Sequence, residues 1–189
     1  MSIPEYVVLV DEENNVLGTM PKSEVHSAQT PLHRAFSSFI FNGKGELLLQ
    51  QRAHSKKTWP LVWSNSCCGH PTLEESPVEA GKRRIGFELG LEMDDLVEIA
   101  PYRYCFTRYG VMENEVCPII VAKTEQLPMP NPDEVEAIKW TDWRTFVDDT
   151  RQHPENWSEW CVEETEILYN SERFCKIWES EWKLEPFWK

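Results

Sequence analysis

The sequence lacks any apolar run long enough to cross a membrane, and it has few cationic residues. Its longest apolar runs are residues 6–10, 47–49 and 119–122, whereas a membrane helix needs about 18 residues. Asp and Glu number 32 against 19 Lys and Arg, which gives a formal net charge of −13. A chain this acidic repels a polyphosphate strand. We therefore expect neither a membrane protein nor a nucleic-acid partner.

The chain also lacks a C-x-x-C pair and a recognisable export signal. Its six cysteines stand at positions 67, 68, 105, 117, 161 and 175, without the spacing of a metal or redox motif. The first residues, MSIPEYVVLVDEE, have no basic start and no extended apolar stretch. We therefore expect reduced thiols, mostly in the core, and a cytoplasmic location.

The length and composition favour one domain. A chain of 189 residues, 41% of them hydrophobic, is long enough to build a core without disulfides. Residues 127–133, LPMPNPD, form the loosest stretch, and their proline content is typical of a connection within a domain. We predict a single domain over residues 1–189, with a core at about 30–165 and a C-terminal helical extension at 166–189.

Strand-type patterns dominate the first two thirds of the chain. The segment N-G-K-G at 42–45 is the clearest hairpin turn, because it separates two apolar segments. The predicted strands are residues 6–10, 35–41, 46–52, 102–107, 114–123 and 135–141.

Two helices are expected, and the first has clear ends. The segment S-P-V-E at 76–79 forms a capping box with proline at the first helical position, and Gly90 supplies a stop, which predicts a helix over 77–89. Apolar residues at 161, 168, 175 and 182 recur every seven positions and predict a second helix over 158–182. Most of its tryptophans are expected to pack on the sheet. Mixed strands covered by helices indicate the α+β class, of the α/β sandwich type.

Three of the five histidines, together with two glutamates, suggest a metal site. His26, His33 and His70 are each more often structural when taken alone. Glu113 and Glu115 lie on one face of a predicted strand, where an exposed end tolerates their repulsion and a divalent cation would make the pairing favourable. Three imidazoles and two carboxylates suit an octahedral Mn, Mg or Fe ion better than a tetrahedral one, with Zn still open.

Residues 69–91 resemble the Nudix box, a loop-helix-loop that holds metal-bound diphosphate. The pattern G-x5-E-x7-R-E-U-x-E-E-x-G-U, where U is bulky and aliphatic, is met at positions 69, 75, 83, 85, 88, 90 and 91. Arg84 and Phe87 stand where hydrolytic members carry glutamates. Because hydrolysis uses metal ions held by those carboxylates, the resemblance implies the same scaffold with a changed reaction. A Nudix-type diphosphate hydrolase is the alternative.

Three further strings resemble type I isopentenyl-diphosphate isomerases. They are T-W-P at 58–60, N-S-C-C-G-H-P at 65–71 and E-N-E-V-C-P at 113–118, within a resemblance that covers residues 7–160. The resemblance implies a Nudix-like mixed sheet flanked by helices, and a monomer or weak homodimer. It implies an enzyme that interconverts isopentenyl and dimethylallyl diphosphate by protonation and deprotonation, for isoprenoid biosynthesis.

The resemblance also implies residue roles. Cys68 and Glu115 form the acid–base pair, with Tyr104 hydrogen-bonded to the glutamate. Trp160 presents a π face to the carbocation. One divalent metal, Mn or Mg with Zn possible, is held by His26, His33, His70, Glu113 and Glu115, and Glu88 serves a second Mg that arrives with the diphosphate.

The diphosphate requires local positive charge in this acidic chain. Lys22, Arg52 and Lys56 match basic positions of the family, and Arg83 is expected to join them, whereas Lys57 is equally well a solvated surface residue. Two alternatives stay open at this point. Arg84 and Glu88 are spaced to pair on the helix surface. Cys67, beside Cys68, is either a packing residue, which is the default, or a neighbour that could oxidise with it.

Overall fold

The computed structural model describes residues 5–188, so residues 1–4 and 189 of the predicted domain lie outside the described part. The strands are β1 (Tyr6–Val10), β2 (Val16–Pro21), β3 (His33–Arg34), β4 (Phe36–Phe41), β5 (Glu46–Arg52), β6 (Trp63–Ser64), β7 (Cys67–Gly69), β8 (Val97–Ala100), β9 (Arg103–Arg108), β10 (Val111–Val116), β11 (Ile119–Lys123) and β12 (Val135–Asp142). The helices are α1 (Lys22–Val25), α2 (Pro77–Leu89), α3 (Trp143–Gln152), α4 (Glu159–Tyr169) and α5 (Glu172–Lys176), with a 3-10 turn η1 (Pro154–Asn156) and a π turn η2 (Ile177–Glu181).

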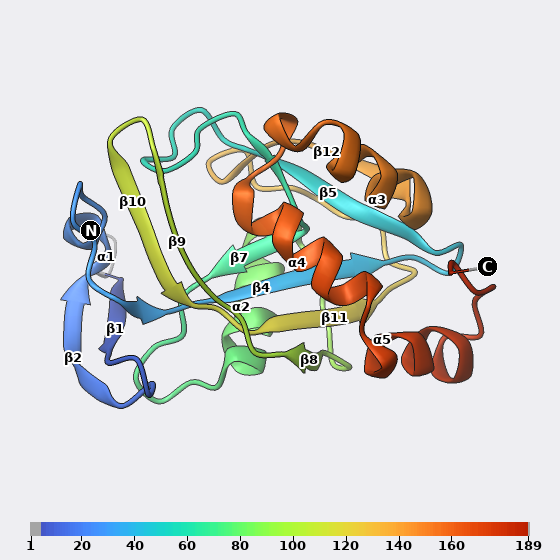
Figure 1. Cartoon of the computed structure of the whole chain (residues 1–189), viewed down its shortest axis with the longest axis horizontal. Helices are drawn as coiled ribbons and strands as arrows, with labels where there is room; N and C mark the ends of the chain where they lie inside the picture. Colours follow the sequence, from blue (N-terminus) through green and yellow to red (C-terminus); the bar gives the residue numbers. More distant parts are fainter. Residues whose placement is uncertain (1–4, 189) are drawn as a thin grey trace.

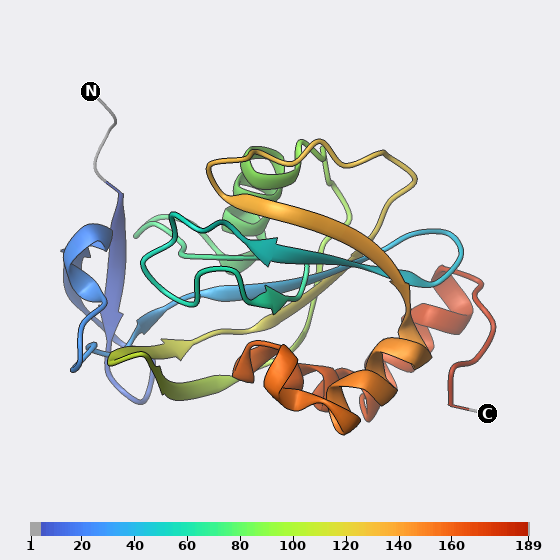
Figure 2. The same ribbon diagram turned by 90° about the horizontal axis from the view of Figure 1, so that it is seen from above.

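The strands form two mixed sheets. The five-stranded sheet has the order β2-β1-β3-β10-β9, and the seven-stranded sheet has the order β12-β5-β4-β11-β8, with β6 paired to β5 and β7 paired to β4. Figure 1 shows the first sheet at the N-terminal end of the molecule and the second running through its middle. Figure 2 shows α2 on one face of the second sheet and α3 and α4 on the other. This layered arrangement of mixed sheets and helices confirms the predicted α+β class.

Each face of the second sheet has its own core. On the α3 and α4 side the core is rich in aromatic residues, among them Phe39, Phe41, Trp143 and Phe174, each at most 1% exposed. On the α2 side it is mainly aliphatic and includes Ile40, Ile85 and Ile120. Strand alternation explains the division, because neighbouring residues of β4 point to opposite faces.

Two chain segments pass from one sheet to the other side by side. β3 pairs in parallel with β10, with His33 opposite Glu115, and β4 pairs in parallel with β11. The backbone bonds from Ala35 N to Val116 O and from Ser37 N to Pro118 O continue the pairing across the junction. The first sheet therefore delivers His33 and Glu115 to the same place where the second sheet begins.

The predicted strand over 114–123 is two strands in the structure. β10 ends at Val116 and β11 begins at Ile119, with Cys117 and Pro118 between them. Proline has no N–H to donate to a ladder, and the chain changes sheets at this position. The strands β2, β3, β6, β7 and β8 and the helices α1 and α3 were not predicted. Most of them are short, but α3 buries Trp143, Phe146, Val147 and Thr150 at a helical spacing that the sequence does carry.

The predicted continuous helix over 158–182 is wrong. The chain forms α4, then a break at Asn170 and Ser171, then α5 and η2. Ser171 acts as an N-cap, accepting a hydrogen bond from Phe174 N at 3.2 Å, and so starts a new helix. The tryptophans do pack against the sheet as expected, since Trp160 and Trp178 are 2% and 3% exposed. Within residues 5–188, no helix has the length and apolar character that a membrane span requires.

Helix α2 is confirmed at both ends. The Ser76 hydroxyl accepts from Glu79 N at 3.2 Å, and the Glu79 carboxylate accepts from Ser76 N at 2.8 Å, which completes the capping box. Gly90 ends the helix in the left-handed region at φ 64°, a conformation that glycine adopts without strain. A Cβ atom at position 90 would lie 3.0 Å from the Met129 carbonyl oxygen. Both the limited space and the positive φ therefore favour glycine at this position.

Replacing the cap should destabilise the protein measurably. Ser76→Ala leaves the Glu79 N–H in the first turn of α2 without its side-chain acceptor, and we expect a loss of about 1 kcal/mol in the free energy of unfolding. Ser76→Asp keeps an acceptor and is the matched control, which should remain close to the original protein. Urea denaturation followed by far-UV circular dichroism measures both. Equal midpoints for the Ala and Asp variants would contradict a contribution from the cap.

Candidate functional site

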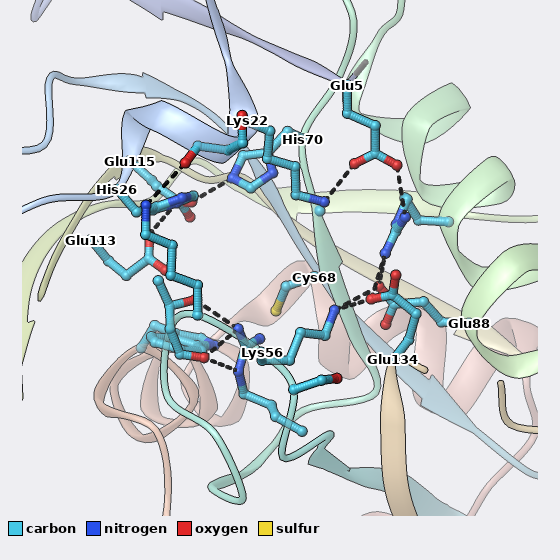
Figure 3. A pocket seen from close by; sticks show the side chains of 18 of the residues that line it. Glu5, Lys22, His26, Lys56, Cys68, His70, Glu88, Glu113, Glu115 and Glu134 are labelled. Carbon is cyan, nitrogen blue, oxygen red and sulfur yellow. Dashed lines mark hydrogen bonds and ion pairs between the residues drawn. The ribbon is translucent and has the colours of Figure 1, made fainter. Parts of the chain in front are cut away.

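A cavity of about 700 Å³ opens where the two sheets meet. Its lining comes from α1, the segment after β5, β7, α2, β9, β10, the segment before β12, and α4. Figure 3 shows His26, His70, Glu113 and Glu115 on one side, Glu88 and Glu134 on the other, and Cys68 between them. The sequence candidates Lys22, Arg52, Lys56, Lys57, Tyr104 and Trp160 also line the cavity, whereas Arg83 does not.

Four side chains converge at the histidine end. Ligand atoms of His26, His33, His70 and Glu115 all lie within 4.8 Å of one another. Glu115 Oε1 is 3.2 Å from His33 Nε2 and 3.0 Å from His70 Nε2. All four side chains are buried or nearly so. A divalent metal ion fits a cluster of this composition.

The hydrogen-bonding pattern of the cluster supports a cation at its centre. His33 Nδ1 is 2.9 Å from the Pro31 carbonyl oxygen, which can only accept, so Nδ1 carries the proton of the neutral ring. His33 Nε2 faces both Glu115 Oε1 and His70 Nε2, the latter 3.3 Å away. Burial lowers the pKa of His33, but the hydrogen bond to Glu115 and its charge outweigh burial and raise that pKa above its ordinary value. Burial lowers the pKa of His70 to about 4, so its ring is uncharged near neutral pH. Imidazole nitrogens and a carboxylate oxygen that converge in a buried site are the donor atoms that a divalent metal ion binds.

Glu113 lies at the edge of this cluster. Its Oε2 is 3.0 Å from His26 Nε2, yet neither atom has a hydrogen-bond partner among the described residues. Both side chains are buried, with exposed fractions of 5% and 7%. Buried polar atoms at contact distance that do not hydrogen-bond are well placed to share an ion instead.

The two neighbouring cysteines point in opposite directions. β7 pairs with β4, and alternation along the strand places Cys67 in the core beneath α2, where it is fully buried. Cys68 faces the cavity, with its Sγ 3.4 Å from Ser37 Oγ. Burial and the nearby Glu164 raise the pKa of the Cys68 thiol to about 12, so the thiol keeps its proton near neutral pH.

An aromatic wall closes the cavity beside Cys68. The ring of Trp160 stacks on that of Tyr104, with centroids 5.8 Å apart, and meets Trp59 edge-on at 5.3 Å. The Tyr104 hydroxyl donates a short hydrogen bond to Glu115 Oε2. Burial, followed by the charge of Glu115, raises the pKa of Tyr104, so this hydroxyl stays a donor.

The opposite end of the cavity carries paired charges. Lys56 contacts Glu134 closely and lies 3.9 Å from Glu88, while Arg84 contacts Glu88 closely and lies 3.2 Å from Glu134. Lys22 pairs with Glu5 at 2.6 Å. The lysine and arginine side chains are thus already balanced by carboxylates before an anionic ligand arrives.

Arg83 and Arg84 lie in different surroundings, although both line a second cavity that shares Lys22 and His70 with the main one. Arg83 lines a neighbouring cavity, where Glu75 holds its guanidinium Nε at 2.7 Å. Arg84 is buried, 4% exposed, and lines the main cavity, so its pair with Glu88 is not on the helix surface. Ala80, Arg84 and Glu88 follow one another at intervals of four residues and lie on the same buried face of α2. This spacing is visible in the sequence and could have indicated that Arg84 and Glu88 share that face.

Glu134 was also missed, and it lies between the proline-rich stretch 127–133 and β12. It is linked to Lys56, which follows β5, because β5 and β12 pair in the sheet. No sequence pattern marks a lone glutamate in such a connection. Only the pairing of the two strands brings it into the cavity.

Comparison with known proteins identifies a family model and several relatives that match most of the chain. The model for the NUDIX domain matches residues 31–161. The isopentenyl-diphosphate Delta-isomerase of Saccharopolyspora erythraea is 46% identical over 166 residues, covering 87% of this chain and 86% of its own. The protein of the same name from Kocuria rhizophila is 47% identical over 161 residues, covering 84% and 89%.

Solved structures support the fold. The crystal structure of DR0079 from Deinococcus radiodurans superposes with a TM-score of 0.69 at 20% identity, covering 86% of this chain and 98% of that one. A MutT protein from Methanosarcina mazei gives a TM-score of 0.60 at 18% identity, covering 72% and 92%. At these identities the likeness concerns the fold alone.

The histidine end should bind a divalent metal ion. We expect a chelated sample to take up Mn²⁺ or Zn²⁺, with a rise in melting temperature, because ligands from separate segments become tied together. His26→Gln should weaken that binding by about tenfold or more, whereas His54→Gln, at an exposed histidine outside the cluster, is the matched control. Calorimetric titration of the chelated proteins measures the affinities. Equal metal affinity in both variants would exclude His26 from the site.

Proposed function

The chain belongs to the isopentenyl-diphosphate Delta-isomerase family of NUDIX-domain proteins, and from that premise we propose that it interconverts isopentenyl and dimethylallyl diphosphate. One observation carries the proposal. Cys68, Glu115, Tyr104 and Trp160 line a single cavity whose other end holds lysine and arginine side chains. The cytoplasmic location, the domain limits and the monomer or weak homodimer stay predictions from the sequence.

The reaction needs two protonation sites on one substrate. A proton is added to the terminal alkene carbon, which leaves a tertiary carbocation, and a proton is removed from the carbon next to the diphosphate-bearing one. Cys68 and Glu115 form this acid–base pair. The Cys68 thiol holds its proton at Sγ near neutral pH, and Tyr104 donates to Glu115 Oε2, so each group has a defined donor or acceptor atom. One proton enters and one leaves, so the reaction consumes no water.

The carbocation needs a wall that stabilises positive charge and excludes solvent. The indole of Trp160 is 2% exposed and borders the cavity, where its π face can attract a cation. Tyr104 stacks against it and holds the ring plane. The buried aromatic wall also keeps water from capturing the carbocation, which would give an alcohol instead of an alkene.

We assign one divalent ion, Mn²⁺ or Mg²⁺ with Zn²⁺ possible, to His26, His33, His70, Glu113 and Glu115. When bound, the ion supplies Lewis-acid polarisation that tunes the basicity of Glu115. Glu88, a buried carboxylate at the charged end of the cavity, is assigned to a second Mg²⁺ that arrives with the diphosphate.

The charged end of the cavity supplies the diphosphate-binding groups. We assign the diphosphate to Lys22, Arg52 and Lys56, which line the cavity together with Arg84, and to Arg83, which lines the adjoining cavity. Arg52 is held by the Thr58 carbonyl oxygen at 3.1 Å from its Nε, which aims its guanidinium beside Trp160. This places charge recognition and the aromatic wall next to each other.

The residues of α2 favour isomerisation over hydrolysis. Arg84 points into the cavity as a cation, and Phe87 is 53% exposed and outside the cavity lining. Neither position offers the carboxylate that a hydrolytic metal cluster would use to activate water. A thiol and a carboxylate on the lining are the groups that an alkene proton transfer uses.

The first test distinguishes the isomerase from a hydrolase. Incubated with isopentenyl diphosphate and Mg²⁺ in deuterated water, the protein should form dimethylallyl diphosphate and introduce deuterium at the protonated carbon. No phosphate or pyrophosphate should be released by the enzyme. Nuclear magnetic resonance and a phosphate assay follow the two outcomes. Rapid phosphate release without isomer or deuterium exchange would replace the isomerase with the hydrolase.

The second test uses the opposed cysteines. Cys68→Ala should abolish turnover while metal content and fold are retained, because it removes a proton-transfer group from the cavity. Cys67→Ala removes the same atom from the core beneath α2 and is the matched control, with kcat nearly unchanged. Glu115→Gln should lose turnover and also bind metal more weakly. An inactive Cys67→Ala beside an active Cys68→Ala would reverse the assignment.

A further inference from the structure

A single buried side chain joins the thiol side of the cavity to its aromatic wall. Asn65 is 0% exposed and lies in the segment between β6 and β7. Its Oδ1 is 3.3 Å from Cys68 Sγ and 3.2 Å from Trp160 Nε1. Asn65 does not itself line the cavity, so it acts on any substrate only through these two residues.

The partners of Asn65 leave its amide one orientation. Nδ2 is 3.0 Å from the Ser38 carbonyl oxygen, which can only accept, so the NH₂ group must point there. The indole N–H of Trp160 can only donate, so Oδ1 must face it. With Oδ1 fixed as an acceptor, the contact with Cys68 Sγ is a hydrogen bond only when the thiol donates its proton to it.

Asn65 Oδ1 also lies close to the start of α4. Ser64 Oγ donates to Asn65 Oδ1 at 2.7 Å and is 2.8 Å from Ser158 Oγ, just before α4. Ser158 N donates to the Trp63 carbonyl oxygen at 3.0 Å. The start of the helix that carries Trp160 is thereby attached to the strand-loop segment that carries Cys68.

We propose that Asn65 is a positioning residue for the isomerisation, whose one carbonyl oxygen holds Cys68 Sγ and the Trp160 ring in a fixed relation. The proposal rests on the proposed function. Proton transfer works only within hydrogen-bond reach of the reacting carbon, and the carbocation forms beside that carbon. The thiol and the π face must therefore be aligned on the same part of the substrate, and a displacement of about 1 Å can lower a rate about 100-fold.

The first variant is Asn65→Ala, compared with Ser66→Ala. Ser66 is the next residue and equally buried, but among residues 5–188 its Oγ bonds only to the backbone of Leu48 and Ile40, at 2.6 and 2.8 Å. We expect Asn65→Ala to lower kcat about 10- to 100-fold with KM for isopentenyl diphosphate nearly unchanged, because the charged end is untouched. Ser66→Ala should lower the melting temperature and leave kcat nearly unchanged. Equal losses of kcat in both variants would reduce Asn65 to a structural residue.

A double-mutant cycle tests the link to Trp160. Trp160→Phe keeps an aromatic ring and removes the indole N–H that Asn65 accepts. If Asn65 acts through this bond, the double variant Asn65→Ala/Trp160→Phe should lose much less kcat than the product of the two single losses. Independent, multiplicative losses would overturn the proposed coupling.

Asn65→Asp keeps the test decisive if the Ala variant does not fold. While neutral, the new carboxyl group accepts from Cys68 and Trp160 through its carbonyl oxygen and donates to the Ser38 carbonyl through its hydroxyl. Once ionised, it has no proton for Ser38, and burial raises its pKa. The ratio of its kcat to that of the original protein should therefore fall as the pH rises.

These outcomes separate the two proposals. An original protein that forms no isomer would refute the proposed function, whatever the Asn65 variants do. An original protein that isomerises, with a flat kcat ratio across pH for Asn65→Asp, would refute only the positioning role.

Discussion

The parallel pairing of β3 and β4 with β10 and β11 is the constraint on which the site depends. It joins two segments that are separated by residues 42–110, and parallel strands require such a long connection. The pairing sets His33 opposite Glu115 in one sheet, and the antiparallel partner β9 sets Tyr104 opposite Glu115. Because the chain then enters the second sheet, β7 can pair with β4 and bring Cys68 beside Ser37. The proposed metal ligands and the proposed acid–base groups are thus adjacent through backbone register.

In two places, adjacent residues of the same type point in different directions and have different surroundings. Cys67 and Cys68 differ only in the face of β7 on which they lie, and one is packing while the other borders the cavity. Arg83 and Arg84 differ by one step around α2, and one pairs with Glu75 while the other reaches Glu88 and Glu134. In both pairs the two residues are of the same type, so the periodicity of the strand or helix decides which of them faces the cavity.

The cavity gathers cations in an acidic protein by burying them with carboxylates. Arg84 and Glu88 are 4% and 2% exposed, and a buried charge without a partner is strongly destabilising. Lys56 and Glu134 complete a balanced set around them. The diphosphate and the second Mg²⁺ proposed above would present the same two signs of charge, so they would replace contacts within this set and leave each buried charge with a partner.

The sequence by itself determined the elements and residues whose signals are local. The capping box, the proline and Gly90 fixed α2 to the residue, and the strings around Cys68 and Glu115 indicated the family and its fold. It did not determine the break of the strand at Pro118, because that break reflects a change of sheet. It also did not determine the break of the C-terminal helix at Asn170, because a strong apolar period continues through that position. Tertiary structure alone brought Glu134 to Lys56 and joined Asn65 to Cys68 and Trp160. Those contacts depend on strand pairing and on the docking of α4, and neither leaves a local pattern in the chain.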